Sequence, residues 1–257
     1  LDSEDALDLQ GRRTAQDGAR RVAVVRLPRI SNFTDVDALG LEPGLDVVFA
    51  SHPSAVADAD LLVLPGTRAT ISDLAWLRSR GLDRAVLAHA AAGRPLLGIC
   101  GGFQMLGRVV RDPGGVEGEV AEVPGLGLLD VETDFVAEKT LRLPRGTWLG
   151  ASASGYEIHH GRVTVTGVTE EFLAGARRGQ IFGTMWHGAL EGDALRSRFL
   201  RETLGIAPSG VSFSSARESR LDHLGDLVEQ HLDVDALLGL ARCGAPTNPP
   251  FLPPGAP

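Results

Sequence analysis

Short apolar runs alternate with longer polar segments through the first half of the chain. Four of these runs are rich in Val, Leu and Ile and are four or five residues long. Runs of this kind are typical of strands that are buried on both faces of a sheet. They predict strands at 22–25, 45–49, 61–64 and 95–99.

Two helices are predicted between the third and fourth strands. The first covers 71–80, where Thr70 followed three residues later by Asp73 resembles a capping box. The second covers 83–92 and stops at Gly93. Strands that alternate with helices indicate an α/β fold with a mostly parallel sheet covered by helices on both faces.

The rest of the chain adds strands and then helices to this body. Short strands are predicted at 126–136, 140–143, 156–166 and 180–185, and a helix at 193–204. Apolar residues at helical spacing lie within 219–240, and 246–257 is rich in proline. The predicted organisation is a linker at 1–20, an α/β domain at 21–206, and a C-terminal helical extension with a proline-rich tail at 207–257.

Composition narrows the functional classes. The 257 residues suffice for one large domain or two small ones. A net charge of −8 argues against a general nucleic-acid binder, which needs a basic face. No apolar run approaches the roughly 20 residues that span a bilayer. Two cysteines indicate a reducing, cytoplasmic environment without a disulfide, and Leu1 in place of Met suggests a piece of a longer polypeptide.

Cys100 occupies the most informative segment. A buried strand leads into this cysteine, Gly98, Gly101 and Gly102 surround it, and an apolar helical pattern follows. This strand–turn–helix layout resembles a nucleophile elbow with Cys in place of Ser. The glycines permit a tight turn, and a thiolate is the reactive form of cysteine. The alternative is a buried cysteine in an ordinary turn. Cys243, near the proline-rich tail, is expected to be a bystander.

His187 is the candidate base for this nucleophile. It follows the predicted strand at 180–185 and precedes Gly188, so it lies at the end of a strand. Functional crevices of open parallel sheets lie at the carboxyl ends of strands. Cys100 and His187 are therefore expected to meet in space. The alternative is a histidine that only packs in the core or bonds within a loop.

Together these segments resemble a known enzyme family, the class I (triad-type) glutamine amidotransferases. The resemblance rests on GICGGFQ at 98–104 and GTMWHG at 183–188. More narrowly, the chain is similar to the C-terminal amidotransferase part of cobyric acid synthases. That likeness rests on RLPRISNFTD at 26–35, LPGT at 64–67, DLAWL at 73–77, GYEIHHG at 155–161 and LDHL at 221–224. It implies a flavodoxin-like fold over most of the chain.

The resemblance implies a role for several residues. Cys100 would attack the side-chain amide of glutamine, and His187 would act as base and then as acid. Gly66 and Gly101 would supply the N–H groups of an oxyanion hole, and Gln104 would help to hold the glutamine. The family's usual triad has a Glu two residues after the histidine, where this chain has Ala189.

The residue that orients His187 therefore stays unidentified. Glu191 is the nearest acidic candidate, although an exposed loop carboxylate is equally plausible there. The segment 26–35 is interpreted as a solvated loop, which its family match associates with an interdomain or substrate-facing role.

Tyr156, Glu157 and His159 are expected either to line the crevice or contact a partner domain, or simply to pack. The adjacent His159 and His160 do not favour a metal site, because neighbouring strand residues point to opposite faces. We therefore expect neither a metal nor a cofactor in this chain.

The liberated ammonia would serve a second domain. This sequence lacks the Gly-rich phosphate-binding loop of nucleotide-binding proteins. The resemblance places ATP, Mg and a corrinoid substrate at an N-terminal synthetase domain outside this chain. There, ammonia would amidate peripheral carboxylates of adenosylcobyrinic acid a,c-diamide. The alternatives are the glutaminase of cobyrinic acid a,c-diamide synthase or of a lipid II amidotransferase, and a non-catalytic binding module on the same fold.

Overall fold

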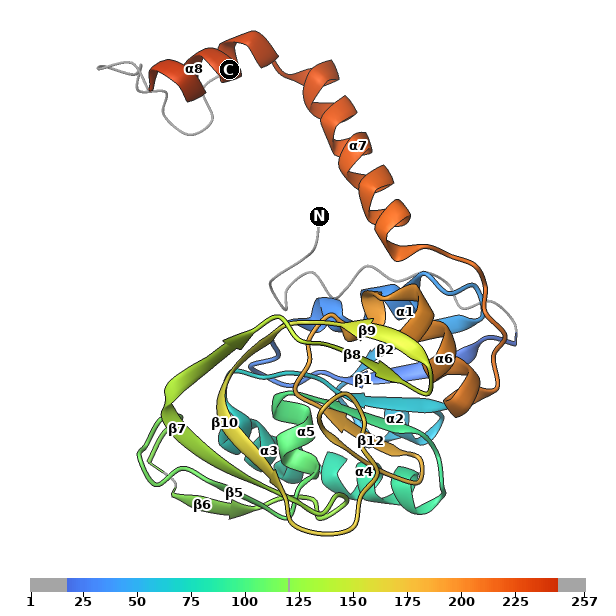
Figure 1. The fold of residues 1–257 in the computed structure, drawn as a ribbon, viewed down its shortest axis with the longest axis vertical. Coiled ribbons are helices and arrows are strands. Elements are labelled where there is room, and N and C mark those ends of the chain that lie inside the picture. Colours follow the sequence, from blue (N-terminus) through green and yellow to red (C-terminus); the bar gives the residue numbers. More distant parts are fainter. Residues whose placement is uncertain (1–17, 120, 245–257) are drawn as a thin grey trace. The chain divides into compact units, whose positions relative to one another are not determined.

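The computed structural model describes residues 18–119 and 121–244 (Figure 1). Nearly all of the predicted linker at 1–20 lies outside these residues, and so does the proline-rich stretch at 246–257. Among the described residues, the strands form one six-stranded sheet, one four-stranded sheet and one two-stranded hairpin.

The six-stranded sheet is the centre of the fold. Its strand order is β11-β12-β4-β3-β1-β2, and every neighbouring pair is parallel except β11 with β12. The mostly parallel sheet and its four predicted strands are confirmed. The strands are β1 (Arg20–Val25), β2 (Leu45–Ala50), β3 (Leu61–Leu64), β4 (Leu96–Ile99), β11 (Ala176–Arg178) and β12 (Ile181–Thr184).

Burial explains why these runs are almost purely apolar. All residues of β3, β4 and β12 are buried, and successive side chains of a strand point to opposite faces. Both faces of the sheet centre are therefore covered, which is the usual state of a parallel sheet. Around Phe182 of β12, aromatic rings pack edge to face or tilted, with centroids 5.1–6.4 Å apart; the cluster is Trp148, Phe172, Phe182 and Phe199.

The helices follow the strands closely in sequence, and the predicted helices at 71–80, 83–92 and 193–204 are confirmed to within one residue. The helical elements of this part are η2 (Phe33–Val36), α1 (Asp37–Gly40), α2 (Pro53–Ala57), α3 (Thr70–Ser79), α4 (Leu82–Ala91), α5 (Gly101–Leu106), η3 (Ala189–Glu191) and α6 (Asp193–Leu204).

The expected capping box at Thr70 is wrong. Ala69 is the N-cap of α3, and no side chain caps this end from the N-cap position. The Thr70 hydroxyl instead donates to Gln104 at 2.9 Å. Asp73 accepts from the Thr67 hydroxyl at 2.6 Å and from the Arg29 N–H at 3.1 Å. These tertiary hydrogen bonds compete with the local cap for the same side chains.

The middle of the chain forms the four-stranded sheet, in the order β10-β7-β5-β6, and the hairpin β8-β9. The predicted strands at 126–136 and 140–143 are not separate, because β7 is continuous over the second and most of the first. Residues 126–129 are not in a strand, since their N–H groups bond to the carbonyls of residues 105–107. The elements are β5 (Val109–Arg111), β6 (Glu122–Pro124), β7 (Val131–Arg142), β8 (Arg145–Trp148), β9 (Ala151–Ser154) and β10 (Glu157–Val165).

The larger of two compact units ends at Phe213. The second contains most of α7 (Phe213–His231) and all of α8 (Val234–Cys243), where the sequence predicts one helical region at 219–240. The break between these helices has a local cause, because the Asp233 carboxylate caps α8 by accepting from Ala236 N–H at 3.0 Å. The predicted end of the α/β domain at residue 206 stays a prediction. Across the described residues, no helix combines the length and the apolar character needed to cross a membrane.

Candidate active site

Cys100 stands at a sharp turn between β4 and α5. Its φ of 49° and ψ of −109° are rare for a residue with a side chain, and such strain is concentrated at functional sites. A Cβ added at Gly102 would collide with the Leu64 carbonyl, and one at Gly98 would lie 2.6 Å from the Leu106 side chain. The glycines thus let α5 pack directly against β3 and β4, as the elbow prediction requires.

His187 meets Cys100 because neighbouring strands end at the same edge of the sheet. β12 runs parallel to β4 with Thr184 opposite Ile99, and the Cys100 N–H donates to the Thr184 carbonyl at 2.8 Å. The side chains of His187 and Cys100 line one pocket, and the Cys100 side chain helps to raise the pKa of the imidazole. Both residues are buried, with 7% of Cys100 and 1% of His187 exposed.

The turn after β3 reaches the same place. A Cβ added at Gly66 would lie 2.9 Å from the Cε1 atom of His187, and one at Gly101 would lie 2.6 Å from the Thr67 side chain. The structure therefore brings together Gly66, Gly101 and the Cys100–His187 pair. The role of the Gly66 and Gly101 backbone N–H groups as oxyanion donors stays a prediction.

Gln104 lies one helical turn after Cys100 and is almost completely buried. Its Oε1 atom accepts from the Thr70 hydroxyl at 2.9 Å, and its Nε2 atom packs against Gly161 of β10. Gln104 borders the same pocket as Cys100 and His187. Its role in holding glutamine stays a prediction.

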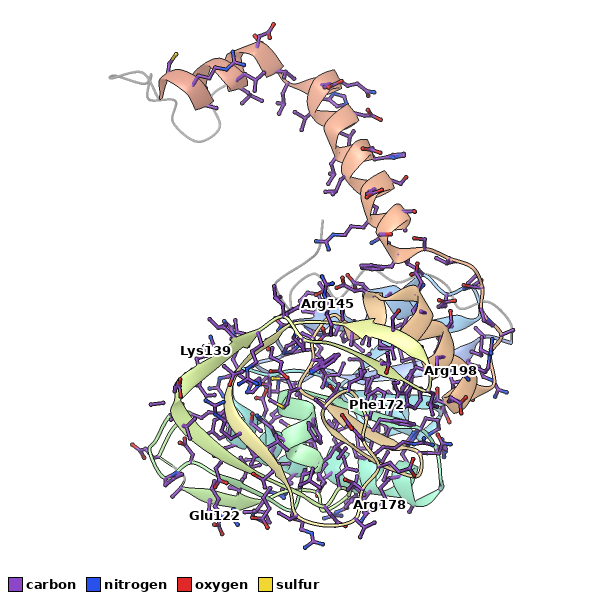
Figure 2. The ribbon with its side chains drawn as sticks, in the orientation of Figure 1. Glu122, Lys139, Arg145, Phe172, Arg178 and Arg198 are labelled. Carbon is purple, nitrogen blue, oxygen red and sulfur yellow. The ribbon has the colours of Figure 1, made fainter. Side chains whose placement is uncertain are left out.

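These residues border a pocket of about 390 Å³. One wall comes from the loops and the helices α3 and α5 at the edge of the central sheet, and the other comes from β7, β10 and the segment between β5 and β6. Charged side chains of both signs line it: Arg68, Glu117 and Lys139, the last on β7 (Figure 2). Burial raises the pKa of Glu117, against hydrogen bonds from the start of α3. The full lining is Ser31, Asn32, Thr67, Arg68, Thr70, Cys100, Gln104, Val116, Glu117, Phe135, Lys139, Ile158, His159, His160 and His187.

Tyr156 is tied to His187 through both backbone and ring. The two residues exchange backbone hydrogen bonds of 3.0 and 2.8 Å, and their rings stack with centroids 5.2 Å apart. Burial, with the nearby Asp35 and Glu191 carboxylates, raises the pKa of Tyr156 to about 12, so its hydroxyl is neutral. Tyr156 thus holds the main chain of His187 in place.

His159 and Glu157 are neighbours in β10. His159 lines the pocket, its Nδ1 atom bonds the Gly161 carbonyl at 2.8 Å, and its Nε2 atom lies 3.8 Å from the Glu157 carboxylate. Burial lowers the pKa of His159. His160 instead bonds the Val136 carbonyl at 3.2 Å. Over residues 18–119 and 121–244, no group of three or more His, Cys, Asp or Glu side chains could hold a metal.

Asp35 is the site residue that the sequence interpretation misses. Its Oδ2 atom lies 2.7 Å from the Nδ1 atom of His187, and its Oδ1 atom accepts from the Gly188 N–H at 2.7 Å. The interpretation of 26–35 as a solvated loop is wrong here, because only 3% of Asp35 is exposed and Phe33 and Val36 are also buried. The signal available was the family match at 26–35, together with the apolar residues on either side of Asp35.

The charges around His187 favour its protonated form. Burial alone lowers the pKa of this imidazole. The Asp35 carboxylate and the Cys100 side chain outweigh burial, and the pKa of His187 is raised to about 10. Glu191 lies beside Gly188 instead, 3.4 Å from where a Cβ at that glycine would be. Ala189, at the usual place of the triad acid, is buried.

The two cysteines have different surroundings. Both are free thiols, and Cys100 is buried whereas Cys243 is exposed at the end of α8. Only Cys100 borders the pocket described above.

Solved structures share the fold. A glutamine amidotransferase superposes with a TM-score of 0.54 at 20% identity, covering 72% of this chain and 99% of its own. The PurLQS structure from Thermotoga maritima gives 0.53 at 17% identity, covering 71% and 98%. These values establish the class I glutamine amidotransferase fold, as predicted.

Curated proteins are far more similar in sequence. Cobyric acid synthases from Mycolicibacterium gilvum and Mycobacterium ulcerans are each 77% identical over the whole chain, and that from Mycobacterium tuberculosis is 76% identical. The chain spans about half the length of these relatives, 52–53%. The model of the CobB/CobQ-like glutamine amidotransferase domain matches residues 21–195. The chain therefore belongs to the family of CobB/CobQ-like glutamine amidotransferase domains.

Proposed function

We propose that this chain is the glutaminase part of an adenosylcobyric acid synthase, with Cys100 and His187 as its catalytic pair. The observation that carries the proposal is that Cys100 and His187 line the same pocket, at the carboxyl ends of the paired strands β4 and β12. The 77% identity to cobyric acid synthases supports the narrower assignment over the cobyrinic acid a,c-diamide and lipid II enzymes.

The reaction begins with the Cys100 sulfur. The imidazole of His187 already holds the proton that the thiol gives up, and the sulfur attacks the side-chain amide carbon of glutamine. The carbon–nitrogen bond then breaks, the nitrogen leaves as ammonia with the proton returned by His187, and a γ-glutamyl thioester remains. Water hydrolyses the thioester with His187 as base, and this step frees glutamate and the thiol.

Other residues in and beside the pocket bind the substrate and its intermediates. Gly66 and Gly101 donate backbone N–H groups to the oxyanion formed during the attack, which is usually a large contribution to acyl-transfer catalysis. Gln104 helps to hold the glutamine. A free amino acid carries an ammonium and a carboxylate, and the pocket lining offers charges of both signs through Arg68, Glu117 and Lys139.

The ammonia serves an N-terminal synthetase domain outside this chain. There, ATP and Mg would activate peripheral carboxylates of adenosylcobyrinic acid a,c-diamide for amidation, in the cytoplasm. The curated relatives are about twice as long as this chain, which is consistent with such a second domain. Tyr156, Glu157 and His159, on the β10 side of the site, would line the crevice or face that domain.

The test compares glutamine and ammonium chloride as nitrogen sources, in a polypeptide that carries both the glutaminase half and the synthetase half. Cys100→Ala is expected to lower glutamine-dependent amidation on the order of 10³-fold or more, because the nucleophile is lost. Amidation supplied with ammonium chloride should stay within about twofold, since ammonia bypasses the glutaminase site. Corrinoid amide formation and glutamate release are measured together.

Cys243→Ala is the matched control, because it removes the other thiol at an exposed position. It should leave both rates unchanged. Persistent glutamine-dependent activity in Cys100→Ala would contradict the nucleophile assignment. Amidation that uses ammonia but not glutamine in the wild-type protein would contradict the glutaminase function.

A further inference from the structure

The usual place of the triad acid holds no carboxylate in this chain. Ala189, two residues after His187, is an apolar and buried residue at the start of η3. A histidine that alternates between base and acid needs a group that fixes its ring and its tautomer. The structure offers one from the opposite end of the sequence.

Asp35 makes two contacts that together fix the orientation of His187. One carboxylate oxygen pairs with the ring Nδ1 atom and the other accepts the next backbone N–H, that of Gly188, each at 2.7 Å. Because Nδ1 is bonded to Asp35, Nε2 is the nitrogen left to serve the Cys100 side. Only 1% of the His187 side chain and 3% of the Asp35 side chain are exposed, so water screens this pair weakly.

The segment that carries Asp35 is bonded to the turn that carries the proposed oxyanion donor Gly66. The Asp35 N–H donates to the Asn32 carbonyl at 2.9 Å, and the adjacent Ser31 N–H donates to the Gly66 carbonyl at 2.9 Å. Asn32 adopts a left-handed conformation with φ 51°, which starts η2 and turns Asp35 inward. The segment after β1 is thus built against the turn after β3, not left in solvent.

We propose that Asp35 is the positioning residue of His187, a triad acid supplied by the segment after β1 instead of the segment after the histidine. The inference rests on the proposed function of Cys100 and His187. Asp35 holds the ring with Nε2 toward Cys100, and its negative charge stabilises the imidazolium that forms when the thiol proton is transferred.

The surrounding charges favour this role for Asp35. Burial by itself would lower the pKa of His187, yet Asp35 and Cys100 raise it to about 10. Glu191, another carboxylate near this loop, borders a separate hollow with Tyr156 and Gly188 and does not line the Cys100 pocket.

The test is Asp35→Asn, which keeps the side-chain size and removes the charge. In the polypeptide with both halves, glutamine-dependent turnover should fall on the order of 10²–10⁴-fold. Ammonia-dependent amidation should be unchanged, which shows that the variant is folded. Glu191→Gln is the matched control and should leave both rates unchanged.

Histidine ring ¹⁵N spectra separate a positioning role from a purely structural one. The His187 signal is identified by its loss in His187→Gln. In the wild type the ring should stay protonated at a pH where an ordinary imidazole, of pKa 6.5, is neutral. In Asp35→Asn it should titrate at a clearly lower pH, because the charge that raises its pKa is gone.

Three results would overturn the inference: a wild-type glutamine rate in Asp35→Asn, loss of both activities, or an unchanged His187 titration. Cys100→Ala is measured alongside. If that variant keeps its glutamine-dependent rate, the proposed function fails, whereas the His187 titration still reports on Asp35 independently.

Discussion

Gly161 shows how a single residue without a side chain shapes the candidate site. It lies in β10 at an irregularity of the β7 pairing, where the register shifts between His159 and Gly161. A Cβ at this position would collide with the Nε2 atom of Gln104 and lie 3.0 Å from the Thr133 side chain. The irregularity therefore lets β10 pack closely against Gln104, whose other side is bonded to Thr70.

Gly161→Ala is expected to raise the KM for glutamine about threefold to tenfold, with kcat much less affected. The added methyl group displaces Gln104, and one hydrogen bond is worth about 0.5–1.5 kcal/mol. Glutamine kinetics measure the effect. Gly44→Ala is the control, because a Cβ there meets nothing within 4 Å. An unchanged KM would mean that Gln104 does not contact the substrate.

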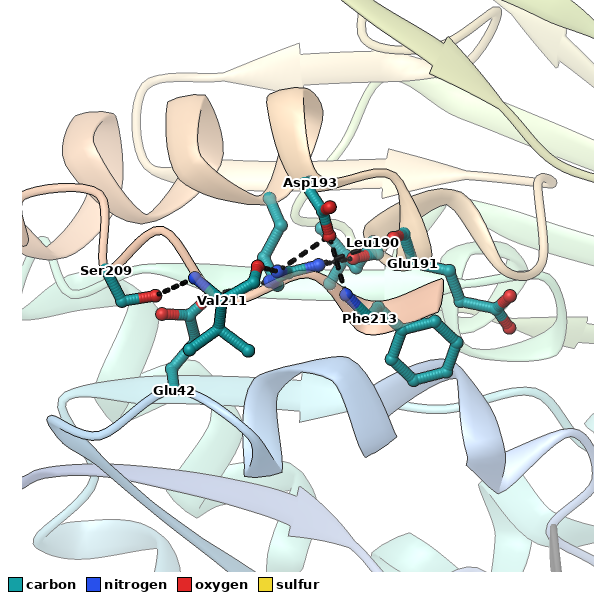
Figure 3. Close-up of polar contacts among 8 residues, drawn as sticks. Glu42, Leu190, Glu191, Asp193, Ser209, Val211 and Phe213 are labelled. Carbon is teal, nitrogen blue, oxygen red and sulfur yellow. Dashed lines mark hydrogen bonds and ion pairs between the residues drawn. The ribbon is translucent and has the colours of Figure 1, made fainter. Parts of the chain in front are cut away.

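At the scale of elements, a buried arginine joins the segments around the histidine loop. Arg196 of α6 is completely buried, and its Nε atom pairs with Glu42 at 2.6 Å. It also donates to the carbonyls of Leu190 at 3.1 Å and Val211 at 2.7 Å (Figure 3). One side chain thus connects α6 with η3, with the turn after α1, and with the segment that leads to Phe213.

Arg196→Met is expected to lower the free energy of unfolding by about 3–5 kcal/mol, because Glu42 is left as an unpaired buried charge. Urea unfolding of the protein measures the change. Arg198→Met on the same helix is the control (Figure 2). Its pair with Glu202, at 3.2 Å, is about one-third exposed, so its loss should cost less than about 1 kcal/mol. Equal losses in the two variants would contradict this account.

On the scale of the whole molecule, an exposed apolar rim of Leu141, Leu143 and Ile158 lies on one side of the candidate site. Leu141 and Ile158 are cross-strand partners of β7 and β10, and they are 68% and 39% exposed. Ile158 lines the Cys100 pocket, whereas Leu143, 85% exposed, borders the hollow beside Tyr156. Adjacent exposed apolar residues often mark an interface. This rim is where we expect the proposed synthetase half to dock.

Replacing Leu141 and Leu143 by Asp should uncouple glutamine hydrolysis from amidation at the synthetase half. Glutamate release should continue, while corrinoid amide formed per glutamate should fall several-fold, because ammonia escapes to solvent. The ammonia-dependent rate serves as the reference for an intact synthetase. Val168→Asp, at a position that is 93% exposed, is the control for added surface charge. Unchanged coupling would contradict an interface at this rim.

The features that depend on neighbouring residues could be predicted from the sequence. A strand buried on both faces must be apolar throughout, so the runs at β1, β3 and β4 are recognisable without a structure. Likewise the glycines around Cys100 signal a turn that only small residues allow. Cys100 and His187 could be paired because both follow strands of one parallel sheet.

Features that depend on distant residues could not be predicted in this way. Asp35 and His187 are 152 positions apart, and the apolar residues beside Asp35 indicate a buried segment without indicating which residue the carboxylate meets. Its burial follows from Phe33 and Val36 packing into the core, which carries the carboxylate to the imidazole and out of water. The Thr70 hydroxyl similarly bonds to Gln104 and not to its own helix. Polar side chains have several possible partners, and tertiary packing selects among them because an unpaired buried polar group is costly.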